Sequence, residues 1–410
     1  MSTLRIRYNP LPKGKIHQLP ASKSISNRAL ILNALSGRMS TLSNLATARD
    51  TQLMKSLLAS QEHLLDAMDA GTTMRFLTAY FAITGQNKVL TGTPRMKERP
   101  IGLLVEALRR MGADVLYLEN EGFPPIETKG FKEQQVGKVA LPGNVSSQYI
   151  SALMMVAPLL PEGLILELQG KVGSWPYIKM TASLMKSFGV DSILKEGTII
   201  VPSSKYHPAS LKIEPDWSAL SYWLAIVALA KEAVITLTDV NSTSIQGDQV
   251  IVEIMEKLGV KTTFLNGNAT LTKTSEIVSE LEWDFTNCPD LAQTVLPVCA
   301  LLGVQGTFTG LESLYIKETD RIAALQNELA KVSAKLEESD KGTFQLTPGT
   351  VPSKRIKINT YHDHRMAMGF APWATLMDLE IEAPEVVNKS YPEFWDDLKV
   401  VGFDVEYVSD

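Results

Sequence analysis

The chain has 410 residues, of which 45% are hydrophobic and 21% are charged, with 40 basic against 45 acidic side chains. This composition excludes a mainly disordered chain, and a formal charge of −5 argues against a nucleic-acid-binding protein, which usually has a basic surplus. The length predicts two domains, and because neither a membrane-spanning nor a secretory apolar stretch is found, we expect a cytoplasmic protein.

One pattern recurs along the chain: an amphipathic helix, a stop residue and a short β-branched strand. The stop residues are Gly112, Gly189, Gly259, Ser333 and Gly402. They recur at intervals of 69 to 77 residues, which predicts repeated units of several strands and two helices. The alternative is that any α/β protein yields such helix–strand joints. The helix expected at 51–60 ends too close to Gly112, so the first unit is predicted to be shortened.

Six predicted helices begin with a basic side chain in or beside the first turn. The segments are 20–28, 69–75, 95–100, 317–321, 362–365 and 389–392. A cation at a helix N-terminus costs a few tenths to about 1 kcal/mol, whereas an anion is favoured there by free backbone N–H groups. The set therefore indicates a shared anionic ligand. The alternative, for any one segment, is a side chain that reaches solvent or pairs with a local acid such as Glu98, Glu318 or Asp363.

Residues 144–149 open a further apolar helix. Ser146 is expected to cap it, and Ser147 and Gln148 add a hydroxyl and an amide that can hydrogen-bond a phosphate or a polyol. Thr319 is expected to cap the helix that begins two residues later.

Taken together, these motifs resemble one family. Residues 19–30, 90–102 and 317–321 are similar to signatures of the 5-enolpyruvylshikimate-3-phosphate synthases, also called 3-phosphoshikimate 1-carboxyvinyltransferases. The match is completed, in family order, by residues 69–75, 145–148, 363–368 and 389–392.

The resemblance implies an α/β protein with the two-domain enolpyruvyl transferase fold. In that fold, repeated βαβαββ units place helices inside and sheets outside. One implied domain is discontinuous, with residues 1–21 plus 217–410, and carries the phosphoenolpyruvate and acid–base residues. The other, residues 22–216, carries most shikimate 3-phosphate contacts, with the active site in the cleft between the two.

The implied reaction moves the enolpyruvyl group of phosphoenolpyruvate to the 5-hydroxyl of shikimate 3-phosphate by addition and elimination, releasing phosphate. It belongs to the shikimate pathway of aromatic amino-acid biosynthesis. The family needs no metal and no organic cofactor, but it does need a proton donor, a proton acceptor and many cations. The implied partners are the two small-molecule substrates, without nucleic acid or membrane, and the chain is expected to act as a monomer.

The resemblance also implies a role for each matching residue. The catalytic residues are Lys23, Asp290, which takes the 5-hydroxyl proton, and Glu318, which moves the methylene proton. The implied shikimate 3-phosphate ligands are Lys23, Ser24, Arg28, Ser146, Ser147, Gln148, Ser174, Tyr177, Asp290 and Lys317. The implied phosphoenolpyruvate ligands are Lys23, Gly71, Arg99, Gln148, Arg321, Arg365 and Lys389.

The chain departs from the family pattern at several positions. Asp69 stands where the family usually has Asn, so its charge should weaken anion and inhibitor binding unless it turns outward to cap the helix. Ser313 replaces another usual Asn, and roughly 20 residues are absent between Asp50 and Asp69, in the shortened unit. Gly71 and Thr72 are retained, which predicts sensitivity to glyphosate, a phosphonate competitor of phosphoenolpyruvate.

Two alternatives share this architecture. UDP-N-acetylglucosamine enolpyruvyl transferase usually has a reactive cysteine in its first-half domain, whereas here Cys288 and Cys299 both lie in the second half, near apolar stretches that favour buried, inert thiols. A non-catalytic anion-binding homologue would lack Glu318 and Asp290. A metal site is not predicted, because the histidines of 362–364 have no matching ligands elsewhere.

Overall fold

A computed structural model describes residues 2–408, which form two compact units. Unit 1 combines the N-terminal segment up to Ala21 with the chain from Glu214 onward, and unit 2 is Ser22–Ile213. Residues 214–216, assigned from the sequence to the second domain, belong to unit 1. No helix in the described residues is long and apolar enough to span a membrane.

Five groups of elements share one order: strand, helix, strand, helix and two further strands. In each, the first two strands pair in parallel, and the last two add antiparallel strands to make a four-stranded sheet. In four groups the last two strands form a β-hairpin, whereas in the fifth they come from the C-terminal and N-terminal segments of the chain. We name each repeat after its first helix. This order is the predicted βαβαββ unit, and the predicted fold class is confirmed.

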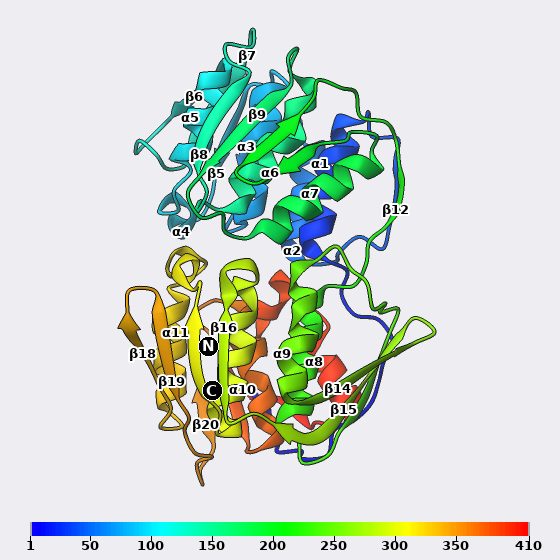
Figure 1. The fold of residues 1–410 in the computed structure, drawn as a ribbon, viewed down its shortest axis with the longest axis vertical. Helices are drawn as coiled ribbons and strands as arrows, with labels where there is room; N and C mark the ends of the chain where they lie inside the picture. Colours follow the sequence, from blue (N-terminus) through cyan, green and yellow to red (C-terminus); the bar gives the residue numbers. More distant parts are fainter. Residues whose placement is uncertain (1, 409–410) are drawn as a thin grey trace. The chain divides into compact units, whose positions relative to one another are not determined.

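Unit 1 contains three complete repeats (Figure 1). The α8 repeat comprises β2 (Lys13–Ile16), α8 (Trp217–Leu229), β13 (Val234–Thr238), α9 (Ile251–Lys257), β14 (Leu258–Leu265) and β15 (Asn268–Ile277). The α10 repeat comprises β16 (Glu280–Asp284), α10 (Ala292–Leu302), β17 (Gln305–Thr309), α11 (Arg321–Ala330), β18 (Lys335–Asp340) and β19 (Thr343–Thr347). The α12 repeat comprises β20 (Ile356–Ile358), α12 (His364–Phe370), β21 (Leu379–Glu382), α13 (Phe394–Val400), β22 (Val405–Val408) and the N-terminal strand β1 (Thr3–Ile6).

Unit 2 contains two complete repeats and one shortened repeat. The α3 repeat comprises β4 (Leu64–Asp66), α3 (Gly71–Ile83), β5 (Lys88–Thr91), the short α4 (Pro94–Lys97), α5 (Gly102–Met111), β6 (Ala113–Tyr117) and β7 (Ile126–Phe131). The α6 repeat comprises β8 (Lys138–Pro142), α6 (Ser147–Val156), β9 (Leu164–Gln169), α7 (Trp175–Ser187), β10 (Ile193–Lys195) and β11 (Thr198–Val201). The α1 repeat comprises β12 (Ser210–Lys212), α1 (Lys23–Leu35), β3 (Thr41–Ser43) and α2 (Arg49–Ala59).

The α1 repeat lacks its hairpin. After α2 the chain runs directly into β4 of the next repeat, so the sheet consists of the parallel pair β12–β3 alone. The shortening predicted from the sequence is therefore the loss of two strands from this sheet.

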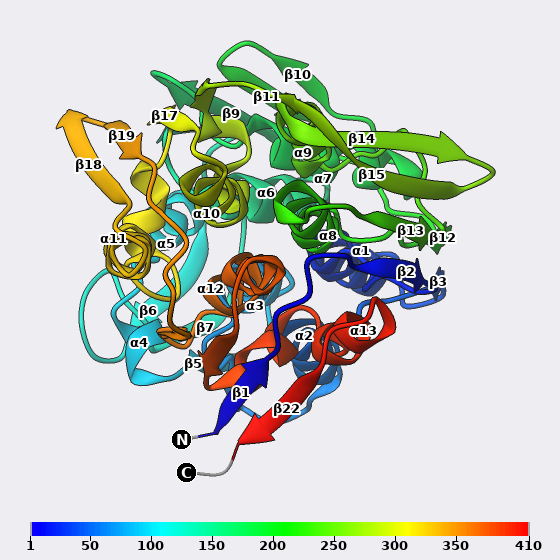
Figure 2. The same cartoon turned by 90° about the horizontal axis from the view of Figure 1, so that it is seen from below.

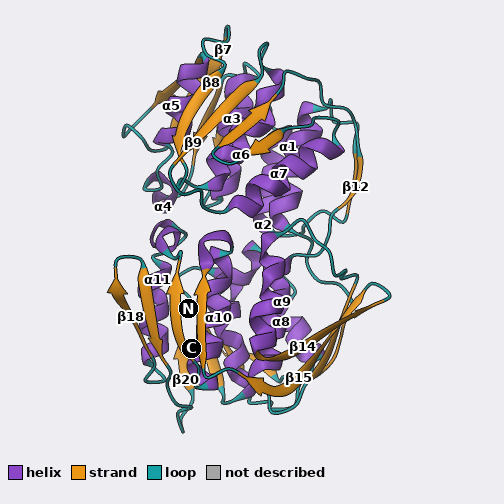
Figure 3. Ribbon diagram, in the orientation of Figure 1, coloured by secondary structure: helices purple, strands orange, loops and turns teal. Residues whose placement is uncertain are grey.

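The helices lie inside each unit and the strands outside, as predicted (Figure 3). In unit 1, α8, α10 and α12 pack against one another, and Figure 2 shows β13 to β15 beside α8 and α9. Every residue of α8 except Ser218 is buried. A helix that is apolar on all sides belongs in a core, and α8 therefore has packing partners around its whole circumference.

All five stop residues have a positive φ angle, from 61° at Ser333 to 111° at Gly112. Each follows the second helix of a complete repeat, where the left-handed backbone ends the helix and turns the chain into the next strand. The repeat spacing read from the sequence is thus confirmed. One cap was predicted wrongly: α11 is capped by Asp320, whose carboxylate accepts from Ala323 N at 3.0 Å, and not by Thr319.

Candidate active site

The predicted site residues lie where strands lead into helices. Within a repeat, the two parallel strands end at the same edge of the sheet, and a helix begins after each. These helix starts present unpaired N–H groups and a partial positive charge. Ten of the expected site residues stand at such junctions in unit 2 and six in unit 1. Because the relevant helices pack together inside each unit, the junctions gather residues that are distant in sequence.

Arg321 is the centre of the charged cluster in unit 1. Its guanidinium, at the start of α11, is 2% exposed. Its Nε lies 2.7 Å from Asp363 Oδ2, Nη1 lies 2.9 Å from Asp290 Oδ1, and Nη2 lies 2.9 Å from Glu318 Oε2. Asp363, which the sequence suggested as a local partner for a cation, is fully buried here and pairs with an arginine from another repeat. A single arginine thus holds three carboxylates from three junctions.

Three further cations complete this group. Arg365 Nη2 lies 2.9 Å from Asp290 Oδ2, and Lys317 Nζ lies 3.5 Å from Asp290 Oδ1. Lys389 is the last residue of the 3-10 helix η7 (Pro384–Lys389), and its Nζ lies 3.4 Å from Glu318 Oε1. The Arg321 cluster, as we call it, consists of Asp290, Lys317, Glu318, Arg321, Asp363, Arg365 and Lys389. Every residue predicted for a site in this unit belongs to it.

The cluster keeps Asp290 ionised. Burial by itself raises the pKa of this carboxyl, but the charges of Arg365, Lys317 and Arg321 outweigh burial and hold the pKa well below its ordinary value. For Arg321, burial lowers the pKa, and Asp363, Glu318 and Asp290 together raise it above its ordinary value. Lys317 differs, because burial lowers its pKa more than Asp290 raises it. The arrangement therefore offers a carboxylate able to accept a proton, beside cations able to hold an anion.

Arg28, in unit 2, is buried among neutral partners. Its Nε donates to Thr181 Oγ1 at 2.7 Å, Nη2 donates to Ser151 Oγ at 3.1 Å, and Nη1 donates to the carbonyl of Ser24 at 2.9 Å. The guanidinium also lies 5.9 Å from the ring centroid of Tyr177. Burial lowers the pKa of Arg28 to about 10, which the charge of Tyr177 opposes. A desolvated cation without an acid at its hydrogen-bonding atoms is poised for an anionic ligand.

A second group in unit 2 surrounds Gly71, the first residue of α3. Arg75 Nη1 donates to Gln148 Oε1 at 3.1 Å, and the amide of Gln148 donates to Thr72 Oγ1 at 2.9 Å. A Cβ at Gly71 would lie 2.8 Å from Arg99 Nη2 and would also clash with Arg75 Nη1. Glycine is therefore required for this close approach of two guanidinium groups to the backbone. Arg75 was not assigned a role from the sequence, although it lies within a matching motif.

The remaining predicted residues of unit 2 also lie at helix starts. Lys23 Nζ forms an ion pair with Asp50 Oδ2 at 3.1 Å. Ser146 caps α6, as predicted, by accepting from Gln148 N at 3.4 Å, and Ser147 is buried. Ser174 precedes α7 with a left-handed φ of 55°.

Asp69 does not cap α3; that helix has no side-chain cap. Its Oδ1 lies instead 2.6 Å from Arg49 Nη2, at the start of α2. The acid at this position is thus paired with a cation. Ser313, the other departure, lies exposed in η5 (Glu312–Ile316).

Both cysteines are buried, as predicted. Burial raises the pKa of the Cys288 thiol to about 12, with a smaller contribution from Asp248, and burial also raises that of Cys299. Neither thiol is suited to act as a nucleophile, because the thiolate is the reactive form.

Comparison with known proteins agrees with the resemblance found in the motifs. The family model for EPSP synthase (3-phosphoshikimate 1-carboxyvinyltransferase) matches residues 11–60 and 54–398. A 3-phosphoshikimate 1-carboxyvinyltransferase of Bacteroides fragilis (strain YCH46) is 47% identical over 392 residues, covering 95% of each chain. That of Vibrio atlanticus (strain LGP32) is 36% identical over 435 residues, covering 98% of this chain and 100% of the relative. A solved structure of EPSP synthase from Acinetobacter baumannii matches the fold over 100% of both chains, with a TM-score of 0.78 at 19% identity.

Proposed function

This chain belongs to the EPSP synthase (3-phosphoshikimate 1-carboxyvinyltransferase) family, and we propose from that premise how its residues perform the reaction. The enzyme transfers the enolpyruvyl group of phosphoenolpyruvate to the 5-hydroxyl of shikimate 3-phosphate and releases phosphate. The observation that supports this best is the Arg321 cluster, in which two carboxylates suited to proton transfer lie among four cations.

Asp290 is the proposed base for the 5-hydroxyl. It has to be ionised at neutral pH to accept a proton, and the lowered pKa of this carboxyl satisfies that requirement. Lys317 contacts the same carboxylate and is the proposed partner of the sugar-like substrate in unit 1.

Glu318 is the proposed proton carrier for the phosphoenolpyruvate methylene. Protonation there makes C2 electrophilic, and the hydroxyl oxygen then forms a bond to C2 to give a tetrahedral ketal. Loss of a methyl proton and of phosphate from the ketal restores the double bond. Arg321 and Lys389 each contact one oxygen of Glu318, so the same groups orient the carboxyl and are available to the substrate anion.

Unit 2 supplies the other ligands in this proposal. Ser24, Arg28, Ser146, Ser147, Gln148, Ser174 and Tyr177 are assigned to shikimate 3-phosphate, and Gly71, Arg99 and Gln148 to phosphoenolpyruvate. Lys23 is assigned to both and to catalysis. Arg28 supports the assignment most directly, because its buried guanidinium contacts two hydroxyls, a carbonyl and two aromatic rings, and a cation with such neutral neighbours gains most from a phosphate.

The test is release of phosphate from the purified full chain. We expect release only when phosphoenolpyruvate and shikimate 3-phosphate are supplied together, and none with phosphoenolpyruvate alone. Release with UDP-N-acetylglucosamine as the acceptor would favour the related transferase, and binding of both anions without release would favour a non-catalytic homologue. Glyphosate should inhibit in competition with phosphoenolpyruvate.

We further propose a monomer in the cytoplasm that acts on these two small molecules alone. Sedimentation of the chain with and without both substrates tests the oligomeric state, and a dimer in either condition would contradict it.

A further inference from the structure

Of the three repeats in unit 1, the α8 repeat is the one for which neither the motifs nor the proposed function supplies a residue. Its two junctions hold Asp216 and Ser218 at the start of α8, and Asp248 in the 3-10 helix η2 (Gly247–Val250) that precedes α9. The corresponding junctions of the other two repeats hold Asp290, Arg321, Arg365 and Lys389. Ser218 and Asp248 thus occupy positions equivalent to those of site residues in the other two repeats.

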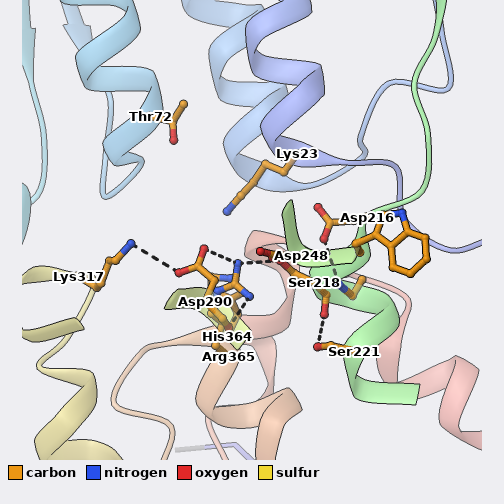
Figure 4. Close-up of polar contacts among 12 residues, drawn as sticks. Lys23, Thr72, Asp216, Ser218, Ser221, Asp248, Asp290, Lys317, His364 and Arg365 are labelled. Atoms are coloured by element: carbon orange, nitrogen blue, oxygen red, sulfur yellow. Dashed lines mark hydrogen bonds and ion pairs between the residues drawn. The ribbon is translucent and has the colours of Figure 1, made fainter. Parts of the chain in front are cut away.

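Asp248 is connected to the Arg321 cluster by an unbroken chain of contacts (Figure 4). Its Oδ2 shares a hydrogen bond with the Ser218 hydroxyl, and Ser218 Oγ in turn accepts from Arg365 Nη2 at 3.3 Å. The same nitrogen lies 2.9 Å from Asp290 Oδ2. Ser218 is also the only residue of α8 that is not fully buried. Asp248 is therefore linked through Ser218 to Arg365, and through Arg365 to the proposed base Asp290.

The other oxygen of Asp248 is buried without a partner. Asp248 is 4% exposed, and its Oδ1 finds no hydrogen-bond donor among residues 2–408. An ionised carboxylate is costly in such a place, whereas a protonated one can donate to Ser218. Burial and, to a smaller extent, Asp290 and Asp216 raise the pKa of Asp248, while Arg365 and the Ser218 hydroxyl lower it, and the net result is a pKa of about 7. These four groups face Asp248 from η4 (Pro289–Leu291), α12 and α8.

The charge of Asp248 changes the balance of the whole cluster. Without it, four cations face three acids, which leaves one positive charge for a ligand. An ionised Asp248 cancels that surplus at Arg365. A neutral Asp248 preserves it, while Ser218 still accepts from Arg365 in either state.

We propose that Asp248 is a positioning residue that holds Ser218 against Arg365 and, by carrying or losing a proton, sets the net charge that the Arg321 cluster offers to an anionic substrate. This role rests on the proposed function, because Arg365 is assigned there to phosphoenolpyruvate. Neutral Asp248 favours binding of that anion, and binding in turn favours the proton on Asp248.

The first test measures kcat/KM for phosphoenolpyruvate from pH 6 to pH 8.5, with shikimate 3-phosphate saturating. The ratio of Asp248→Asn to wild type cancels the titration of the substrate itself. We expect this ratio to rise severalfold across pH 7, mainly through KM, because asparagine is neutral at every pH and can still contact Ser218. A ratio that stays flat across this range would overturn the role.

Matched variants separate charge from position. Ser218→Ala should raise KM for phosphoenolpyruvate at every pH, because Arg365 loses a partner. Asp397→Asn is the control: this carboxyl on α13 also has a pKa raised by burial, but its hydrogen bond is to Tyr391. The control should keep the wild-type pH profile. If it instead reproduces the Asp248→Asn profile, the effect is not specific to the cluster and the inference fails.

The second test needs no turnover. Infrared spectra of the free wild-type chain should show a protonated carboxyl at pH 6 that is lost by pH 8.5 and is absent from Asp248→Asn. If phosphate is never released but this band titrates, the proposed function fails while the proton on Asp248 stands. If phosphate is released but the band is missing at pH 6, the inference alone fails.

Discussion

The buried arginines Arg321 and Arg365 of unit 1 lie in an electrostatic setting opposite to that of the buried arginines Arg28 and Arg75 of unit 2. In unit 1, Arg321 is surrounded by three carboxylates, and Arg365 pairs with one of them. In unit 2, Arg28 donates to two hydroxyls and a carbonyl, and Arg75 donates to the amide oxygen of Gln148 and the carbonyl of Pro100. The guanidinium groups are buried in both units. In unit 1 they are neutralised by carboxylates of the same unit, whereas in unit 2 these arginines donate to neutral groups.

This difference separates the contribution of a buried arginine to the stability of the fold from its contribution to ligand binding. Removing one member of a buried, paired cluster leaves uncompensated charges, so unit 1 arginines are expected to be structural as well as functional. Removing a buried cation with neutral partners relieves a desolvation cost, so Arg28 is expected to matter for binding more than for stability.

Replacing the proposed proton carrier gives the largest expected effect. We expect Glu318→Gln to lower kcat by about 10³-fold, within the range for loss of an acid–base group, while both substrates still bind. Rapid-quench turnover and equilibrium binding measure the two quantities. Glu312→Gln, an exposed acid of the preceding helix η5, is the control and should be near wild type. Turnover within tenfold of wild type would remove Glu318 from the mechanism.

Arg321→Met tests the structural side of the comparison. It leaves Asp363, which is fully buried, without its closest cation, and we expect the free energy of unfolding to fall by about 3–5 kcal/mol. Urea denaturation measures this. Arg355→Met breaks a partly exposed pair with Glu380 and should cost less than about 1 kcal/mol. Equal losses for the two variants would contradict the special status of the cluster.

Arg28→Met tests the other side. Methionine is shorter and loses the guanidinium beside the Phe76 ring, but it also removes a desolvated charge, so we expect the free energy of unfolding to change by less than about 1 kcal/mol. Affinity for shikimate 3-phosphate should fall about 100-fold, or about 2.7 kcal/mol. Calorimetry and urea denaturation of one preparation give both numbers. A stability loss as large as that of Arg321→Met would erase the distinction between the units.

The smallest expected effect concerns the ion pair between Arg49 and Asp69. Asp69 is a departure from the family pattern, and Arg49 is its cationic partner. Because both side chains are partly exposed, we expect Arg49→Ala to raise KM for phosphoenolpyruvate only a few-fold, by leaving Asp69 unneutralised. Asp69→Asn should restore it. A double-mutant cycle should give a coupling of about 0.2–1 kcal/mol, and independent effects would show that the pair does not shield the site.

The repeat could be predicted from sequence because its signal is local. A residue such as Gly259 ends a helix with its own backbone angle, and the spacing of such residues needs no knowledge of the fold. Charged residues within a motif of several functional residues, such as Arg321, could likewise be predicted from the sequence. Their partners were not: that Arg321 contacts Asp363, 42 positions further along, depends on how α11 packs against α12's junction.

The α8 repeat shows what the motifs could not supply. Asp248 lies in a segment without basic residues. Ser218 lies in the first turn of a helix whose other residues are those of a buried core helix. A sequence signal did exist, because the stop at Gly259 predicts a junction before α9 that is equivalent to the one holding Arg321. Whether a given strand–helix junction holds a functional side chain depends on the burial of that side chain and on the residues around it, and both are known only from the folded structure.

The missing hairpin of the α1 repeat has a consequence for how unit 2 comes apart. Strands β3 and β12 are the first and last strands of that unit, and just beyond their short pairing Thr41 N donates to Ala209 O at 2.9 Å and Ile213 N donates to Ser43 O at 3.0 Å. A two-stranded ladder has little stability of its own. On warming, this seam should part first and let the chain ends of unit 2 separate while the four-stranded sheets persist, so its amides should exchange with solvent ahead of those in the four-stranded sheets of the unit.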